Sequence, residues 1–109
     1  MEVLTVANRI EAIIKEIGVC RREIESKGNA RAKSIAEYDL RLGDAIETLR
    51  TEGKFPVSLI EKLAKKLCHS YRESMEIAEI EYKATIANLD ALKAQLNGYQ
   101  SIMRYLDET

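Results

Sequence analysis

The chain has 109 residues, of which 46% are apolar and 32% are charged, and its net charge is -1. This length suits one domain, and the apolar content is too high for a disordered tail. The balanced charge gives no global attraction to nucleic acid or to a membrane, so either partner would need a local patch. No apolar run reaches 18 residues, and the first residues lack the basic and apolar regions of a secretory signal. We therefore expect a cytoplasmic protein with no membrane partner.

Apolar residues spaced three and four apart predict a first long helix over about residues 5–51. Thr5 or Asn8 could cap its start. The apolar stripe pauses between Ile24 and Ile35, an interval that preserves helical phase. Gly28-Asn29 lies in that interval and could end a helix. Two alternatives follow: one continuous helix kinked near residues 27–29, which the preserved phase favours, and two helices broken there.

The only proline marks the turn, over residues 52–57. Gly53 and Pro56 end the first helical pattern, because proline disfavours helical geometry at the residue before it. Ser58 and Glu61 then have the spacing of a capping box, in which each side chain accepts a hydrogen bond from the other's backbone N–H. The sequence therefore predicts a second helix over about residues 58–107.

Together the two helices predict an all-α fold, an antiparallel helical hairpin with coiled-coil-like packing. Facing residues should have numbers that sum to roughly 108, which places Leu42 near Leu67 and Ile17 near Ala91-Leu92. Two helices share one seam and cannot enclose a core, so we expect hairpins to assemble into a homo-oligomeric bundle. The residues assigned to this oligomer seam share an apolar or aromatic side chain on one helical face, and are Ile10, Ile13, Ile17, Leu89, Leu92, Leu96, Tyr99 and Met103.

The residues that could carry metal or covalent chemistry are few. Cys20 and Cys68 lie on or beside the apolar stripes, which predicts buried thiols in a reducing compartment, with a structural disulfide as the alternative. Cys68 and His69 are adjacent, so on a helix they point about 100° apart and cannot easily share an ion. There is no zinc motif and no phosphate-binding glycine loop. We therefore expect no enzyme activity, no metal and no cofactor.

One cluster of charge suggests an anion site. Lys62, Lys65, His69 and Arg72 follow one helical stripe, and Tyr71 could add a ring. Glu73, Glu76, Glu79 and Glu81 form an acidic block directly after it. The stripe could bind the phosphate of a nucleotide or a nucleic acid, or an acidic protein. Alternatively, it is an exposed face that pairs with the acidic block of a neighbouring copy. Sparse aromatic residues disfavour single-stranded nucleic acid, whose binding sites usually provide stacking rings.

Several helical segments carry a familiar pattern: Ala7-Asn8-Arg9-Ile10, Ala36-Glu37-Tyr38-Asp39, Ser58 through Lys65, Cys68, Glu79 through Lys83, Gln95 through Ile102 and Arg104-Tyr105-Leu106. Together these segments resemble small helical proteins encoded by prophages of Gram-positive bacteria. This resemblance implies a phage product in a bacterial cytoplasm and supplies no functional residue. In that context we expect a non-enzymatic, self-assembling protein that antagonises host defence, by sequestering a nucleotide signal or by blocking a host protein. The alternative is a single-stranded nucleic-acid-binding accessory of phage recombination.

Overall fold

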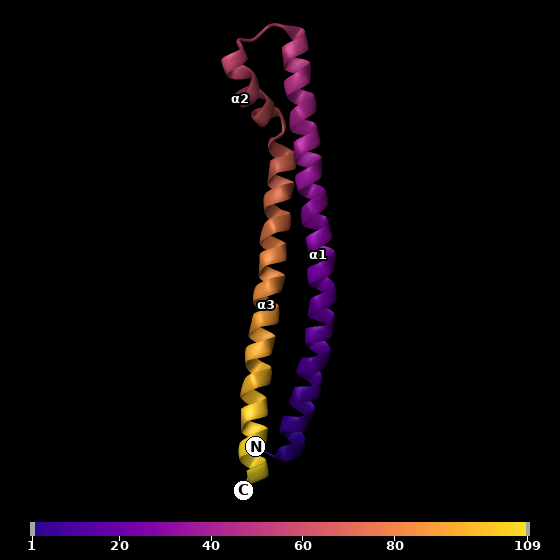
Figure 1. Cartoon of the computed structure of the whole chain (residues 1–109), viewed down its shortest axis with the longest axis vertical. Helices are drawn as coiled ribbons and strands as arrows, with labels where there is room; N and C mark the ends of the chain where they lie inside the picture. The colour runs from indigo at the N-terminus through magenta and orange to yellow at the C-terminus, as the bar shows by residue number, and fades with distance from the viewer. Residues whose placement is uncertain (1, 109) are drawn as a thin grey trace. The chain divides into compact units, whose positions relative to one another are not determined.

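The computed structural model describes residues 2–108, which form three helices and no strand. Helix α1 spans Val3–Glu52, α2 spans Val57–Leu67 and α3 spans His69–Glu108. The direction of the chain reverses between α1 and α3 (Figure 1). The prediction of an all-α antiparallel helical hairpin is confirmed.

Helix α1 runs without interruption through Gly28-Asn29, so its continuity is confirmed over the broken alternative, and the kink near residues 27–29 stays a prediction. The apolar positions on both sides of the glycine keep one phase, and their packing outweighs the roughly 1 kcal/mol that glycine costs inside a helix. The expected start is corrected, because α1 begins at Val3 and both Thr5 and Asn8 lie inside it. Neither of these two side chains is therefore an N-cap.

The turn between α1 and α2 depends on one glycine and one proline. Gly53 adopts a φ of 65°, a left-handed conformation that costs glycine little. Pro56 is the N-cap residue of α2, with extended dihedrals of -60° and 145°, and its carbonyl accepts the N–H of Leu59 at 3.0 Å. The predicted capping box is wrong, since the cap makes no side-chain hydrogen bond. Because α2 starts at Val57, Ser58 lies in its first turn, past the position from which a side chain can cap.

The predicted single helix over residues 58–107 is divided in two at Cys68. This residue has φ of -98° and ψ of 15°, outside the helical range, although its N–H still donates to the carbonyl of Ala64 at 3.1 Å. Its own carbonyl accepts the N–H groups of Tyr71 and Arg72, both at 3.1 Å, and so starts α3. No glycine or proline marks this break. Ala64 and Cys68 are both buried.

The chain divides into two compact units, which we call the terminal unit (Met1–Ser26 and Lys83–Thr109) and the loop unit (Lys27–Tyr82). In the terminal unit, Ile13, Ile17, Cys20 and Leu92 form the buried cluster. Half-buried apolar residues pack around it, namely Ile24, Leu89, Leu96 and Tyr99. The predicted proximity of Ile17 to Leu92 is confirmed by this cluster.

In the loop unit, α2 covers the end of α1. Leu49, Ile60 and Ala64 are buried there, with Leu42, Ala45, Ile46 and Leu63 packed around them. The predicted pairing of Leu42 with Leu67 is wrong: Leu67 is 67% exposed, and Leu63 joins Leu42 in the cluster instead. Because α2 is a separate short helix, the side that it packs against α1 differs from the expected side. The prediction of one continuous helix had placed Leu67 on that side.

Candidate functional site

The five residues of the predicted anion site lie on two helices. Lys62 and Lys65 belong to α2, whereas His69, Tyr71 and Arg72 belong to α3, after the break at Cys68. The four basic side chains are exposed and Tyr71 is half-buried. The predicted stripe is therefore an outer surface of the loop unit and is interrupted where the two helices meet.

Two of the four basic side chains already have acidic partners. Lys65 Nζ lies 3.2 Å from Glu61 Oε1, and Arg72 Nε lies 3.2 Å from Glu76 Oε1. Both pairs are one helical turn apart and exposed, so each contributes only a few tenths of a kcal/mol. Lys62 and His69 form no ion pair within residues 2–108. The four basic side chains therefore do not converge on a single position where one anion could bind.

The ring of Tyr71 is also engaged within the chain. The Arg41 guanidinium lies over it, 5.2 Å from the ring centroid, and Arg41 Nε donates to Glu37 Oε1 at 3.0 Å. The hydrogen bond to Glu37, followed by the charges of Tyr71 and Glu37, raises the pKa of Arg41 above its usual value. The guanidinium of Arg41 thus covers one face of the tyrosine ring.

Tyr71 does line a shallow hollow, between α1 and α3 of the loop unit. This hollow of about 410 Å³ is lined by Lys33, Ser34, Glu37, Tyr71 and Ser74. Lys33 is its one cationic lining residue, and Glu37 beside it carries a negative charge. Because a phosphate would meet the Glu37 carboxylate here, the hollow is poorly suited to an anion.

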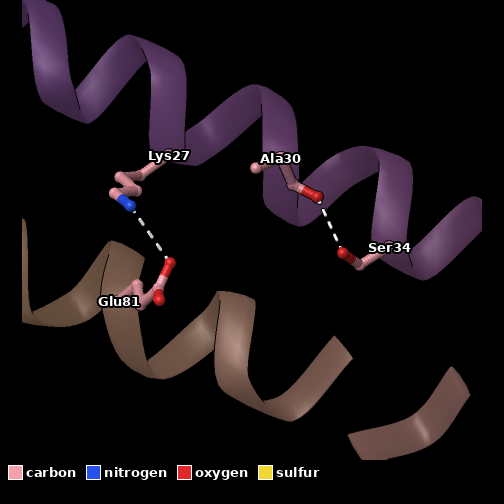
Figure 2. A network of polar contacts seen from close by, with 4 residues as sticks. All are labelled: Lys27, Ala30, Ser34 and Glu81. Carbon is pink, nitrogen blue, oxygen red and sulfur yellow. Dashed lines mark hydrogen bonds and ion pairs between the residues drawn. The ribbon is translucent and has the colours of Figure 1, made fainter. Parts of the chain in front are cut away.

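The acidic block after the basic stripe is bound to the chain's own cations. Lys27 Nζ of α1 donates to Glu81 Oε2 of α3 at 3.1 Å. Figure 2 shows this contact together with the hydrogen bond that the Ser34 hydroxyl donates to the Ala30 carbonyl. Arg31 lies 3.6 Å from Glu79, and its guanidinium is 5.7 Å from the centroid of the Tyr82 ring. The residue numbers of Lys27 and Glu81 also match the predicted register. These intrachain pairs leave less acidic charge for the basic stripe of another copy.

The eight residues of the predicted seam lie mainly in the core of the terminal unit. Ile13, Ile17 and Leu92 are buried by the chain itself, and Leu89, Leu96 and Tyr99 pack against them. Ile10 and Met103 are half-buried, and line a wide hollow with Gln100 and Arg104. One chain thus uses this seam to join its own two helices. An oligomeric role for the half-buried members stays a prediction.

Both cysteines are buried free thiols, as the apolar stripes predicted. Cys20 is 2% exposed, donates to the Thr85 carbonyl at 3.4 Å and accepts from Asn88 Nδ2 at 3.8 Å. Cys68 is 4% exposed. Among the described residues, no group of three or more His, Cys, Asp or Glu side chains is placed to hold a metal ion. Burial keeps both thiols away from an external substrate.

The most unusual feature is the amount of apolar surface. Among the described residues, thirteen large hydrophobic side chains are exposed, whereas ten hydrophobic residues are buried. Scattered exposed leucines are ordinary, but contiguous ones mark interaction surfaces. Exposed leucines form one such set on α2 in the loop unit, and α3 in the terminal unit exposes a row of small residues, mostly alanine. Sequence reasoning missed both. Tracking alanine as an apolar residue would have found the second.

Comparison with protein-family models, with curated proteins and with solved structures gives no match. Across residues 2–108, no helix has the length and hydrophobicity needed to cross a membrane.

Proposed function

We propose that the protein is a non-enzymatic binding protein that self-associates and acts by contacting another protein. The observation that carries this proposal is an unpartnered face of α3 in the terminal unit. Its residues alternate in steps of three and four, and all are exposed: Ala84, Ala87, Ala91, Ala94, Gly98, Ser101 and Tyr105. We call this set the outer stripe. Steps of three and four keep side chains in register with a second helix.

The outer stripe faces away from the core of its unit. Leu92 is the α3 residue that is buried in the terminal unit, and half-buried Leu89 and Leu96 lie on the same side of the helix as Leu92. The outer stripe occupies the opposite side. The outward positions of α1 in the same unit are mixed: Asn8, Glu11, Lys15 and Arg22 are polar, whereas Leu4 and Val19 are exposed apolar residues. The outer stripe of α3 carries no charged side chain, which supports its contact with another apolar helix.

A second copy of α3 fits this stripe in the antiparallel direction. Aligning Ala94 with Gly98 of the second copy also places Ala87 opposite Tyr105, so the largest residue faces a small one. Small side chains at the centre allow the two backbones to approach closely. About 20 residues of paired helix would cover the stripe, a length of on the order of 30 Å.

Charge supports the same register. It brings Asp90 of each copy beside Arg104 of the other, giving two equivalent ion pairs about the twofold axis. Within residues 2–108, Asp90 forms no ion pair, and Arg104 makes a weak contact with the Ser101 hydroxyl at 3.4 Å. In a parallel pair, Asp90 would face Gln95 and gain no opposite charge. The antiparallel dimer is therefore the form that the side chains favour.

The biological setting of this proposal is antagonism of host defence, and it rests on the prophage resemblance. Of the two routes considered, blocking a host protein has more support than sequestering a nucleotide. Lys65 and Arg72 are already paired, and the ring of Tyr71 is covered by Arg41. The same covered ring removes the main stacking group from the nucleic-acid alternative. Exposed apolar helix faces are surfaces that a protein partner can bury.

Sedimentation velocity of an Ala94→Glu variant tests the self-association. Two glutamates near the centre of the antiparallel pair would be desolvated beside each other, so the variant should sediment as a monomer while the wild-type chain sediments as a dimer. Ala12→Glu is the matched control, since Ala12 is an exposed alanine on α1 of the same unit. It should leave the dimer intact, and circular dichroism should show equal helicity in all three. An Ala94→Glu chain that still dimerises would contradict the proposal.

A further inference from the structure

We propose that the exposed side of α2 binds an amphipathic helix of another protein whose apolar face is bordered by acidic residues. This proposal rests on the proposed function, because it names the surface that contacts the target. It concerns the loop unit, whereas self-association concerns the terminal unit. The two can therefore be disrupted separately.

Helix α2 has apolar residues on two of its sides, and only one side is covered. Ile60 and Ala64 face the core of the loop unit and are buried. Leu59, Leu63 and Leu67 follow the same spacing of four residues on the adjacent side. Leu59 is 46% exposed and Leu67 is 67% exposed. We call these three residues the leucine row.

The leucine row is continuous with the core of the loop unit. Its middle member, Leu63, packs against the buried cluster of Leu49, Ile60 and Ala64. Leu42 and Ile46 of α1 border the same cluster and are half-buried. A helix laid along the leucine row would thus extend an existing core, and would turn two packed helices into three. Such helix-in-groove contacts use apolar anchors at spacings of three and four.

The charges beside the leucine row specify an acidic partner. Lys62 and Lys66 are exposed and, on a helical projection, border the row on the side away from the core. Among the described residues neither lysine has an acidic partner, whereas their neighbour Lys65 is paired with Glu61 at 3.2 Å. Two uncompensated lysines beside an apolar face match glutamate or aspartate at the edge of a bound helix.

A second copy of this chain is a poorer occupant. If two leucine rows packed together, Lys62 and Lys66 of both copies would lie close to one another and repel. Three of the four residues of the acidic block that could relieve this repulsion are already paired: Glu76 with Arg72, Glu79 with Arg31 and Glu81 with Lys27. The α2 surface therefore favours a different protein over self-association.

The test uses the full chain and two fluorescently labelled helical peptides of about 14 residues. Both carry leucines at positions i, i+4, i+7 and i+11. One has glutamates beside the leucines, and the other has lysines at the same positions. Fluorescence anisotropy should show the acidic peptide binding at least tenfold more tightly than the basic one. Equal binding of both peptides, or binding of neither, would overturn the proposal.

Two variants test the named residues. Leu67→Asp should abolish binding of the acidic peptide, and Lys62→Glu combined with Lys66→Glu should reverse the peptide preference. Leu40→Asp is the control, because Leu40 is an exposed leucine on α1 of the same unit. Binding that survives Leu67→Asp, or a preference unchanged by the double charge reversal, would contradict the assigned surface. Capture of the chain by anionic vesicles in place of the acidic peptide would show that the surface binds lipid.

The oligomeric state separates this proposal from the previous one. The α2 variants should remain dimers in sedimentation, and Ala94→Glu should still bind the acidic peptide as a monomer. If Ala94→Glu remains a dimer but Leu67→Asp loses the peptide, the self-association proposal alone fails. If the α2 variants bind the peptide normally, the docking proposal alone fails.

Discussion

The ring of Tyr82 lies against the backbone of α1 at Gly28, where an added Cβ atom would meet Tyr82 Cε2 at 3.4 Å. The same ring lies beneath the guanidinium of Arg31. An alanine methyl at 3.4 Å is in ordinary van der Waals contact, so this close approach accommodates alanine. A larger side chain at this position would have to pass the Tyr82 ring.

We predict that Gly28→Ala stabilises the chain. Alanine removes the helical cost of glycine, about 0.5–1 kcal/mol, without displacing the ring. Gly28→Leu should destabilise it, since the larger side chain must push Tyr82 away. Gly43→Ala is the control, because no atom lies within 4 Å of its added Cβ. Urea unfolding at fixed protein concentration measures all three. A loss of stability in Gly28→Ala but not in Gly43→Ala would mean that the ring packs more tightly than described.

Leu92 is predicted to be the most sensitive core position on α3. It is buried at the centre of the terminal-unit cluster, so Leu92→Ala should reduce the free energy of unfolding by about 2–5 kcal/mol. Leu40→Ala should change it by less than about 0.5 kcal/mol, because Leu40 is exposed. Chemical denaturation compares the two leucines. Equal losses at both positions would show that the terminal-unit core is not packed as described.

Ser58→Ala should leave stability almost unchanged. The capping box predicted from sequence implies a loss of about 1 kcal/mol. In the structure the cap of α2 makes no side-chain hydrogen bond, and alanine is a better helix former than serine. Thermal unfolding should therefore show an equal or slightly higher midpoint for the variant. A midpoint lowered by several degrees would restore Ser58 as the cap.

Both thiols should react slowly with an alkylating reagent in the native state. Cys20 and Cys68 are buried, so the reagent must wait for the chain to open. Unfolding in urea should make both thiols react fast. Mass spectrometry can count the alkylated cysteines. Rapid native labelling of Cys68 alone would reopen the possibility of a reactive cysteine next to His69.

The sequence predicted those features that depend on a repeated spacing. The seam around Ile17 and Leu92 follows from apolar residues at steps of three and four, and the same phase carried α1 through Gly28. The break at Cys68 carries no glycine or proline, so no residue type indicates it, and only the backbone dihedrals of Cys68 reveal it. The helix after the turn begins at Val57, with Pro56 as its N-cap residue, and not at the predicted Ser58. This small shift is enough to remove Ser58 from the cap position.

The candidate surfaces were harder to predict than the fold. The basic residues from Lys62 to Arg72 can be seen in the sequence. The pairing of Lys65 with Glu61 and of Arg72 with Glu76 depends on side-chain geometry. The outer stripe consists mostly of alanine. Alanine favours a helix but does not indicate which side of the helix is buried. The significance of the outer stripe appears only once Leu92 shows which side of α3 is buried.

Native mass spectrometry of the wild-type chain is the most direct test of whether the chain works as a self-associated binding protein. We expect a dimer with no nucleotide-sized adduct, which Ala94→Glu converts to a monomer and Ala12→Glu preserves. A wild-type chain that remains a bare monomer at tens of micromolar would contradict self-association. A dimer that retains a nucleotide would contradict the proposal that the chain acts by protein contact.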